Sequence, residues 1–281
     1  MIRKIAILFC IVMTLCSTFT LSGCYADHII CYTNAFFAPF EYYDGIEIVG
    51  VDIDIMRMVA KRLGKSITFE NKEFGTLINY VESGKLCDCS AAGFTITEER
   101  LEKVNFSIPY YTSVQYVVAH KNTFAPLYNA EDNLCIMWEQ LKGKRIGVQL
   151  DTTGNIYVEG EINGWEDDSD GILQGSGASC MEYDEALLAY SALKAGRIDA
   201  LVIDRLPSGY LINNDSDEYV AYPLYYDENT ATEEEYGIAV NKKNSLLLET
   251  INEVLSELMM PVNDKGENGI DLLVNAHYGV K

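Results

Sequence analysis

Residues 91–111 read AAGFTITEERLEKVNFSIPYY and contain the change of pattern that sets the architecture of this 281-residue chain. The apolar segment 87–93 predicts a buried strand, and residues 98–103 predict a helix after a short turn. A strand that leads into a helix is the repeating unit of α/β proteins. The stretch therefore favours an α/β fold, and the same pattern continues on both sides of it.

The first unit also contains a helix with a clear start and stop. Residues 52–63 place Ile55, Met56 and Val59 at helical spacing, and Gly64 supplies the stop signal. The other elements expected here are strands at 28–33 and 66–70 and a helix at 74–81 that ends near Gly84.

A second unit of the same kind follows the β-branched segment 114–120. Its expected elements are strands at 145–150 and 200–204, a helix that opens at Thr152-Thr153-Gly154, a Gly-rich exposed loop at 161–179, and helices at 183–195 and 205–212. The chain closes with a strand-like segment, 235–240, and two helices at 245–259 and 270–278. Alternating strands and helices predict parallel sheets, and the length suggests about two domains of roughly 150 residues.

The N-terminus has the features of an export signal. Arg3 and Lys4 precede residues 5–26, which carry no charge, and this run contains Leu21-Ser22-Gly23-Cys24, which resembles the lipobox of bacterial lipoproteins. The alternative is an uncleaved membrane anchor, because 22 uncharged residues could just span a bilayer. Small residues and a cysteine after the apolar run favour processing. We therefore expect a signal peptide at residues 1–23 and a lipid on Cys24.

The charge balance excludes one class of partner. Removal of residues 1–23 takes away two of the 21 basic and none of the 42 acidic residues, so the mature charge is 19 minus 42, or −23. Such a surface repels phosphate backbones, so nucleic acid is not an expected partner. Solubility outside the cell explains the charge, and a monomer is expected.

The cysteines predict neither a metal site nor a disulfide framework. Five of the eight remain after Cys10, Cys16 and Cys24 are assigned to the signal and the lipid, and five is an odd number. Cys87 and Cys89 are too close in sequence to make a zinc site alone, and no second pair completes four ligands. We expect most of the five to be small buried side chains, and a Cys31–Cys89 bridge stays open. No cofactor is expected.

The stretch 91–111 resembles the signature of the family 3 extracellular solute-binding proteins, the polar amino-acid receptors of ABC importers. Four further segments resemble the family in the same order: FFAPFEYYDGIEIVGVDIDIMRMVAKRLG (36–64), LKGKRIGVQLDTTG (141–154), LKAGRIDALVID (193–204) and EEYGIAVNKKN (234–244). The resemblance implies the two-lobed periplasmic-binding-protein fold (type II), with two hinge strands and the ligand in the cleft. Lobe 1 is then residues 25–111 plus 237–281, and lobe 2 is residues 112–236.

The resemblance also implies which residues bind the carboxylate and the ammonium group of the amino-acid ligand. Arg100 matches the family's carboxylate-binding arginine, and a guanidinium suits a carboxylate bidentately. Thr152 and Thr153 open a helix whose free N–H groups favour the same anion. By itself this turn is a common helix cap, and Arg100 is a common solvated charge.

Asp204 matches the aspartate that pairs with the ligand's ammonium group, and Thr95 and the Gly93 carbonyl match its other acceptors. Without the family, Asp204 could equally cap the next helix. Burial of a zwitterion requires a partner for each charge.

The resemblance implies a side-chain pocket between Phe37 and Phe74, although core packing is the common role of such rings. Receptors for basic amino acids often carry Asp near Asn34, so Asn34 favours a neutral polar ligand. The implied mechanism is hinge closure around the ligand, followed by delivery to an ABC permease and its ATPase.

Three other functions remain to be compared with this one. Cyclohexadienyl and arogenate dehydratases share the fold but need a general acid, and no residue here must play that part, so no enzyme is expected. A sensor is disfavoured because the sequence ends at Lys281, just after the last expected helix. The acidic loop 166–171 departs from a calcium-binding EF-hand loop, since Glu166 leads and Gly177 takes the twelfth position.

Overall fold

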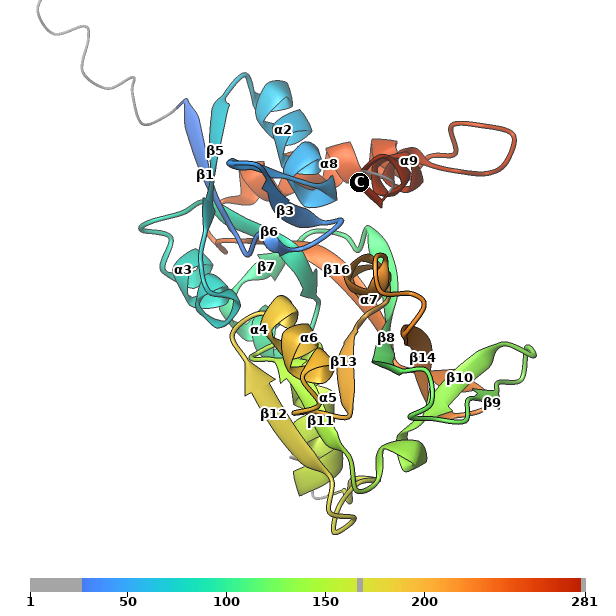
Figure 1. Cartoon of the computed structure of the whole chain (residues 1–281). Coiled ribbons are helices and arrows are strands. Elements are labelled where there is room, and N and C mark those ends of the chain that lie inside the picture. Colours follow the sequence, from blue (N-terminus) through green and yellow to red (C-terminus); the bar gives the residue numbers. More distant parts are fainter. Residues whose placement is uncertain (1–26, 166–168, 279–281) are drawn as a thin grey trace, which may run out of the picture.

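The computed structural model describes residues 27–165 and 169–278. The predicted signal peptide and Cys24 lie outside these residues, as does the start of the acidic loop at 166–168. Within the described part, no helix combines the length and apolar character that a membrane span requires. The elements form two lobes, one above the other in Figure 1.

The upper lobe contains the first strands and both ends of the described chain. Its strands are β1 (His28–Thr33), β2 (Phe36–Phe37), β3 (Glu41–Asp44), β4 (Glu47–Val49), β5 (Ser66–Asn71), β6 (Cys89–Thr95) and β7 (Asn105–Phe106). Its helices are α2 (Val51–Leu63), the 3₁₀ turn η1 (Phe74–Thr76), α3 (Leu77–Ser83), α4 (Glu98–Lys103), α8 (Ser245–Leu258) and α9 (Gly269–Tyr278).

The lower lobe is built from the middle of the chain. Its strands are β9 (Leu127–Tyr128), β10 (Leu134–Met137), β11 (Arg145–Gln149), β12 (Ser179–Tyr183), β13 (Ala200–Asp204), β14 (Tyr219–Asp227) and β15 (Thr230–Ala231). Its helices are the 3₁₀ turn η2 (Trp138–Leu141), α5 (Thr153–Asn163), α6 (Ala186–Lys194) and α7 (Arg205–Ile212).

Two long strands, β8 (Tyr111–His120) and β16 (Glu233–Val240), connect the lobes (Figure 1). The sheet order is β12-β11-β13-β8-β16-β6-β1-β5, so β8 and β16 lie at its centre. Strands β1, β5 and β6 are parallel, and so are β11, β12 and β13, as the alternating pattern predicts. Strands β8 and β16 pair antiparallel with each other and with their outer neighbours.

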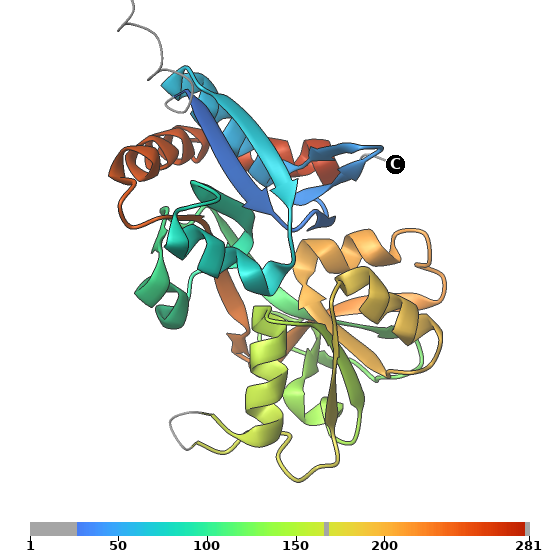
Figure 2. The ribbon, with the colours of Figure 1, turned by 90° about the vertical axis from the view of Figure 1, so that its left-hand side faces the viewer.

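Each lobe has its own apolar core. In the upper lobe, Ile55, Met56 and Val59 of α2 are fully buried, and α8 packs beside α2, while Gly64 ends α2 in the left-handed conformation with φ 67°. In the lower lobe, Trp138 is fully buried. Figure 2 shows the two bodies from the side, with the lower-lobe helices against the upper lobe.

Several predicted elements need correction. Strand β6 begins at Cys89 rather than at residue 87, and the predicted helix at 74–81 divides into η1 and α3. The predicted loop at 161–179 is too long at both ends, since α5 continues to Asn163 and β12 begins at Ser179. Residues 179–183 form strand β12, which pairs with β11, so helix α6 begins at Ala186 rather than at residue 183.

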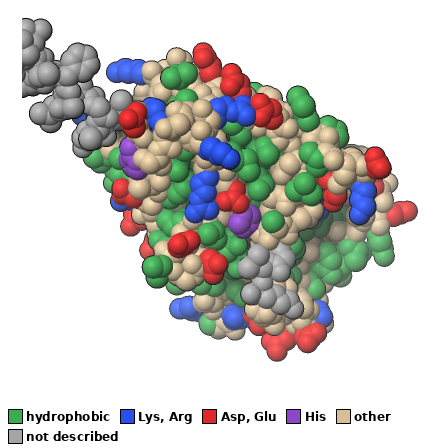
Figure 3. All heavy atoms as spheres, turned by 90° about the horizontal axis from the view of Figure 1, so that it is seen from above, with side chains coloured by type: hydrophobic (Ala, Val, Ile, Leu, Met, Phe, Trp, Pro, Cys, Tyr) green, Lys and Arg blue, Asp and Glu red, His purple; other side chains and the backbone are tan. Residues whose placement is uncertain are grey.

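The five described cysteines are unpaired, and all but Cys180 are buried. Cys31 and Cys89 are neighbours across β1 and β6 but do not form the conceivable bridge. Burial raises the pKa of the Cys87 thiol to about 12, so it stays protonated. The cysteines therefore behave as small apolar side chains, as expected. Seen from above, acidic and basic side chains alternate with apolar ones on the surface (Figure 3).

Candidate ligand-binding site

Arg100 extends from α4 toward the boundary between the lobes. Thr97 caps this helix by accepting a hydrogen bond from the Arg100 backbone N–H at 3.3 Å, which fixes the turn that carries the side chain. The guanidinium donates to the Thr95 carbonyl at 2.8 Å and to the Asp151 carbonyl, in the lower lobe, at 3.1 Å. Arg100 as a whole is 8% exposed, so it is not a solvated charge on the helix surface.

The side chains of Thr95 and Thr153 meet across the lobes. The Thr153 hydroxyl donates to the Thr95 hydroxyl at 2.8 Å, and both side chains are buried. Thr152 is the N-cap of α5, since its hydroxyl accepts from the Asn155 N–H. The first turn of α5 therefore faces the end of β6, where Arg100 also lies.

Gly93 brings the backbone of β6 close to an aromatic ring. Its φ is +55°, and a Cβ at this position would lie 2.8 Å from Cε1 of Phe37. Its N–H donates to the Asp52 carboxylate at 3.0 Å. Glycine is thus required both by conformation and by space.

Asp204 ends β13 and is 7% exposed. It accepts a hydrogen bond from the Tyr236 hydroxyl of β16, and its side chain makes no capping hydrogen bond to α7. Burial raises the pKa of this carboxyl, and the hydrogen bond from Tyr236 opposes the rise. The helix-cap alternative is therefore excluded.

The two predicted aromatic rings occupy different surroundings. Phe37 is half-buried, with its ring centre 6.0 Å from that of Phe40 and 6.4 Å from that of Tyr236. Phe74 lies 4.9 Å from Phe94, and the Arg100 guanidinium stands 5.6 Å from the Phe74 ring centre. Phe74 therefore packs against Arg100, and neither Phe37 nor Phe74 is among the residues that line the cavity described below.

Asn34 uses both ends of its amide inside the protein. Its Nδ2 donates to the Lys72 carbonyl at 2.9 Å, and its Oδ1 accepts from Gln149 of β11 at 3.1 Å. Asn34 is therefore a third interlobe contact, together with Arg100 and Thr95. These contacts show the two lobes closed on each other.

Sequence reasoning missed Glu234 and Gln115. The Glu234 carboxylate accepts from the Thr95 hydroxyl at 2.6 Å and from Gln115 Nε2 of β8 at 2.7 Å. Burial, then the nearby Asp204 charge, raises the pKa of Glu234 to about 8. No sequence signal pointed to Glu234, because this residue precedes the expected strand at 235–240 and its partners, Thr95 and Gln115, lie on two other strands.

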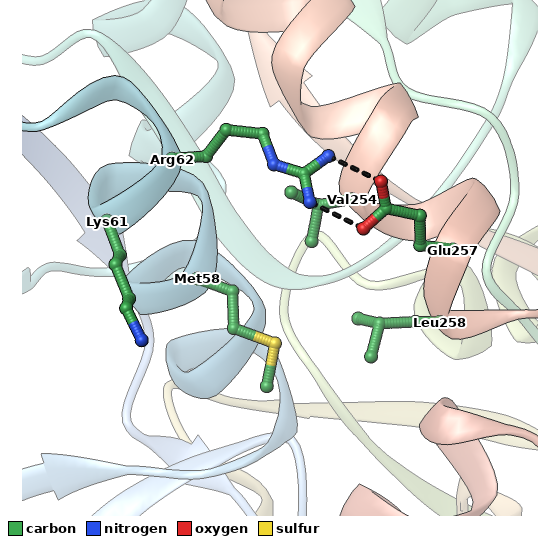
Figure 4. Close-up of a pocket in the computed structure, with 6 residues that line it drawn as sticks. All are labelled: Met58, Lys61, Arg62, Val254, Glu257 and Leu258. Atoms are coloured by element: carbon green, nitrogen blue, oxygen red, sulfur yellow. Dashed lines mark hydrogen bonds and ion pairs between the residues drawn. The ribbon is translucent and has the colours of Figure 1, made fainter.

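A cavity of ≈ 1140 Å³ opens beside Glu234, and neither Arg100 nor Asp204 is among its lining residues. Thr95, Thr153 and Glu234 form part of its wall, and Tyr157 and Trp165 form another part. A second pocket of ≈ 460 Å³ lies between α2 and α8 (Figure 4). There, Arg62 is paired with Glu257, and none of the predicted site residues is among its six lining residues.

No group of three or more His, Cys, Asp or Glu side chains within 27–165 and 169–278 has a metal-binding arrangement. The site brings together an arginine, buried carboxylates, two hydroxyls and a helix N-terminus, contributed by two lobes. These groups can hold a small polar molecule with both signs of charge.

Two lobes joined by two strands, with charged groups at their boundary, define a two-lobed binding protein of the periplasmic type. Residues 29–261 match the model of the bacterial extracellular solute-binding proteins, family 3, and the chain belongs to this family. The predicted fold class is thereby confirmed. Proteins of this family act outside the cytoplasm, which indicates export of this chain.

Three similar proteins agree with this placement. The ABC transporter arginine-binding protein 1 of Escherichia coli (strain K12) is 30% identical over 254 residues, which are 88% of this chain and 92% of that protein. The structure of an ancestral arginine-binding protein bound to arginine is 32% identical with a TM-score of 0.70, over 90% of this chain and 99% of that one. The ancestral arginine-binding protein bound to glutamine is 32% identical with a TM-score of 0.69, over the same shares of 90% and 99%.

Proposed function

We propose that this chain captures one free polar amino acid between its lobes and delivers it to an ABC importer. Lobe 1 would comprise residues 25–111 plus 237–281, and lobe 2 residues 112–236. The observation that carries the proposal is that Arg100 and Asp204 are both buried, and that the negative charge of Asp204 is near enough to raise the pKa of Arg100 against the effect of burial. The relatives are amino-acid-binding proteins, which supports binding without chemistry.

The ligand's carboxylate would be held by Arg100 and by the first turn of α5. The guanidinium is buried beside that turn, and its hydrogen bonds inside the protein go to neutral carbonyls, those of Thr95 and Asp151. A carboxylate is a stronger acceptor than a carbonyl, so a bound ligand would replace such a bond. Thr153 is the first residue of α5 and would supply the N–H group at the helix start, since the Thr152 N–H already donates to the Gln149 carbonyl at 3.4 Å.

The ligand's ammonium group would be held by Asp204, the Thr95 hydroxyl and the Gly93 carbonyl. The desolvation that raises the pKa of Asp204 would be offset by a buried cation beside it. Phe37, Phe74 and Asn34 would surround the ligand's polar side chain.

Binding would act through closure of the lobes. The contacts of Thr153 with Thr95 and of Asp151 with Arg100 join opposite lobes. A ligand that touches both lobes stabilises the closed state alone, so it shifts the open–closed equilibrium. The closed form would then dock on the permease, whose ATPase drives import.

The N-terminal sequence supports a lipid anchor. Residues 1–23 would be removed, and Cys24 would carry the lipid that holds a monomeric receptor at the outer face of the cell membrane. Mass spectrometry of the mature protein tests this step, since retention of residues 1–23 would contradict it.

Titration calorimetry of the mature domain against the common L-amino acids and cystine tests the function. We expect at least one to bind, and Arg100→Ala to weaken it by about 3 to 5 kcal/mol because a buried charge loses its partner. Arg145→Ala is the matched control, since Arg145 is half-exposed and pairs with Asp199 on the surface. Near-normal affinity of Arg100→Ala would refute the assignment.

A further inference from the structure

Thr95 is held by hydrogen bonds at both of its polar ends. Its carbonyl accepts from the Arg100 guanidinium at 2.8 Å, and its hydroxyl oxygen lies 2.6 Å from a carboxyl oxygen of Glu234. The Thr153 hydroxyl stands 2.8 Å from the same Thr95 oxygen. Thr95, Thr153 and Glu234 are all buried, so water competes little for these contacts.

Glu234 is fixed in turn by the neighbouring strand β8. Its other carboxyl oxygen accepts from Gln115 Nε2 at 2.7 Å. Gln115 is fully buried, and its own side-chain oxygen has no hydrogen-bond partner among the described residues. The amide is therefore oriented to donate to Glu234, although this orientation leaves a buried acceptor unpaired.

The protonation state of Glu234 sets the direction of the hydrogen bonds that link it to Thr95 and Thr153. An ionised carboxylate can only accept, so the single hydroxyl proton of Thr95 must point at Glu234. Thr153 then donates to Thr95. Under these conditions Thr95 has a lone pair, but no proton, left for a ligand.

Protonation of Glu234 reverses this direction. Gln115 already donates to one carboxyl oxygen, so the new proton lies on the oxygen that faces Thr95 and donates to it. Thr95 must then turn its own proton away from Glu234. The same hydroxyl thus offers only an acceptor in one state and a donor in the other.

We propose that Glu234 is a positioning residue that makes the Thr95 hydroxyl an acceptor for the ligand's ammonium group. The inference rests on the proposed function, in which Thr95 receives that ammonium, and it adds a residue that acts through Thr95. An ammonium group has three donors and no acceptor, so a Thr95 proton that points at it would oppose binding. Glu234 need not touch the ligand for this effect.

Proton linkage gives the proposal a measurable sign. Burial, then the Asp204 charge, raises the pKa of Glu234 to about 8, so the group is largely protonated at pH 6 and about half ionised at pH 8. Since the ligand selects the ionised form, binding should release a proton and become tighter as the pH rises. If only the ionised form binds, the affinity rises by up to about 50-fold between pH 6 and 8.

The ammonium group is common to all α-amino acids, so the pH dependence should not depend on the ligand's side chain. A neutral ligand and a cationic ligand should release equal numbers of protons through Glu234. This equality separates the role of Glu234 from any direct contact with the side chain of the ligand.

Other ionisable groups also face Glu234. They are Arg100 of α4, Asp204 of β13, Tyr157 of α5, Tyr226 of β14 and Tyr236 of its own strand. Burial raises the pKa of Tyr157, Tyr226 and Tyr236, so these phenols stay neutral below pH 8. Asp204 titrates together with Glu234, but its hydrogen bond comes from Tyr236. A change at Thr95 therefore separates the two carboxyl groups.

A double-mutant cycle of Glu234→Gln and Thr95→Val, measured by calorimetry between about pH 6 and 8, tests this role. The probes are L-arginine and L-glutamine, which keep their charges in this range, and, if neither binds, the common L-amino acid that binds most tightly. Thr95→Ser keeps the hydroxyl and serves as the conservative rescue. Glu233→Gln is the charge control, because Glu233 lies on the same strand with an exposed side chain.

We expect the wild type, Thr95→Ser and Glu233→Gln to bind more tightly as the pH rises and to release up to about one proton at pH 7. Glu234→Gln and Thr95→Val should each lose most of this pH dependence. At pH 8 Thr95→Val should also weaken binding by roughly 10- to 100-fold, the usual effect of a lost hydrogen bond to a charged group. The double variant should bind no more weakly than the weaker single variant.

Three results would overturn the inference while leaving the proposed function intact. They are a wild-type affinity that does not change with pH, an unchanged pH dependence in Thr95→Val, and losses that add in the double variant. If Glu234→Gln does not fold, Thr95→Val and Thr95→Ser decide alone, since neither alters a charge. If no common L-amino acid binds the wild type, the proposed function itself fails.

Discussion

Gly75 lies at a close contact between the two lobes. It belongs to η1 of the upper lobe, and a Cβ there would lie 2.7 Å from Cγ and 3.1 Å from Cβ of Asp151 in the lower lobe. Rotation of the Asp151 side chain can move Cγ, but its Cβ is fixed to the backbone. Gly75→Ala therefore forces the lobes slightly apart in the closed state.

The magnitude follows from the cost of inserting one methyl group into a tight contact. Such overpacking costs about 1 to 3 kcal/mol. Only the closed state contains the contact, so the whole amount opposes ligand binding and predicts a loss of roughly 5- to 150-fold in affinity. The φ of Gly75 is outside the left-handed region, so the backbone accepts alanine without strain.

Calorimetry gives the affinity, and small-angle scattering with ligand gives the degree of closure. The matched rescue is the double variant Gly75→Ala/Asp151→Gly, because Asp151 has φ 62°, which suits glycine, and its two backbone hydrogen bonds would remain. We expect the double variant to regain most of the affinity. Wild-type affinity and full compaction in Gly75→Ala alone would refute the closed contact.

Three further predictions concern stability. Burial raises the pKa of Asp52 to about 6, so the native state binds more protons than the unfolded chain between about pH 4 and 6. The free energy of unfolding should therefore fall by about 3 kcal/mol as the pH rises through this window. Urea titrations of the Asp52→Asn variant should not show this decrease. Trp138→Ala should cost about 3 to 5 kcal/mol by urea unfolding, because the side chain is fully buried in the lower core. Thr97→Ala should cost about 1 kcal/mol and Thr97→Ser much less in the same assay, since only the first removes the cap of α4.

The sequence predicted the elements whose signals are local. Helix α4 and strand β13 have the expected bounds, because Thr97 caps the first and Asp204 ends the apolar run of the second. Strands that depend on distant partners were missed. Strand β14 contains Pro223, which argues against a strand, yet β14 pairs with β8 and that pairing prevails.

The residues of the candidate site also fall into two groups, those that a local sequence pattern indicates and those that depend on distant partners. Arg100, Thr153 and Asp204 could be proposed from the sequence because each falls in a segment with a family pattern. Glu234 and Asp151 could not, because their importance depends on what the other lobe and the other hinge strand bring beside them. Interlobe contacts leave no local periodicity in a sequence.

Strand β16 shows why the hinge and the site act as one unit. Glu234 and Tyr236 share a face of this strand, but Glu234 accepts from Thr95 of the upper lobe, whereas Tyr236 donates to Asp204 of the lower lobe. A change in charge at either carboxylate therefore acts on a strand that connects the two lobes. For this reason a variant that removes the charge of Glu234 or of Asp204 should change both the affinity for the ligand and the degree of closure.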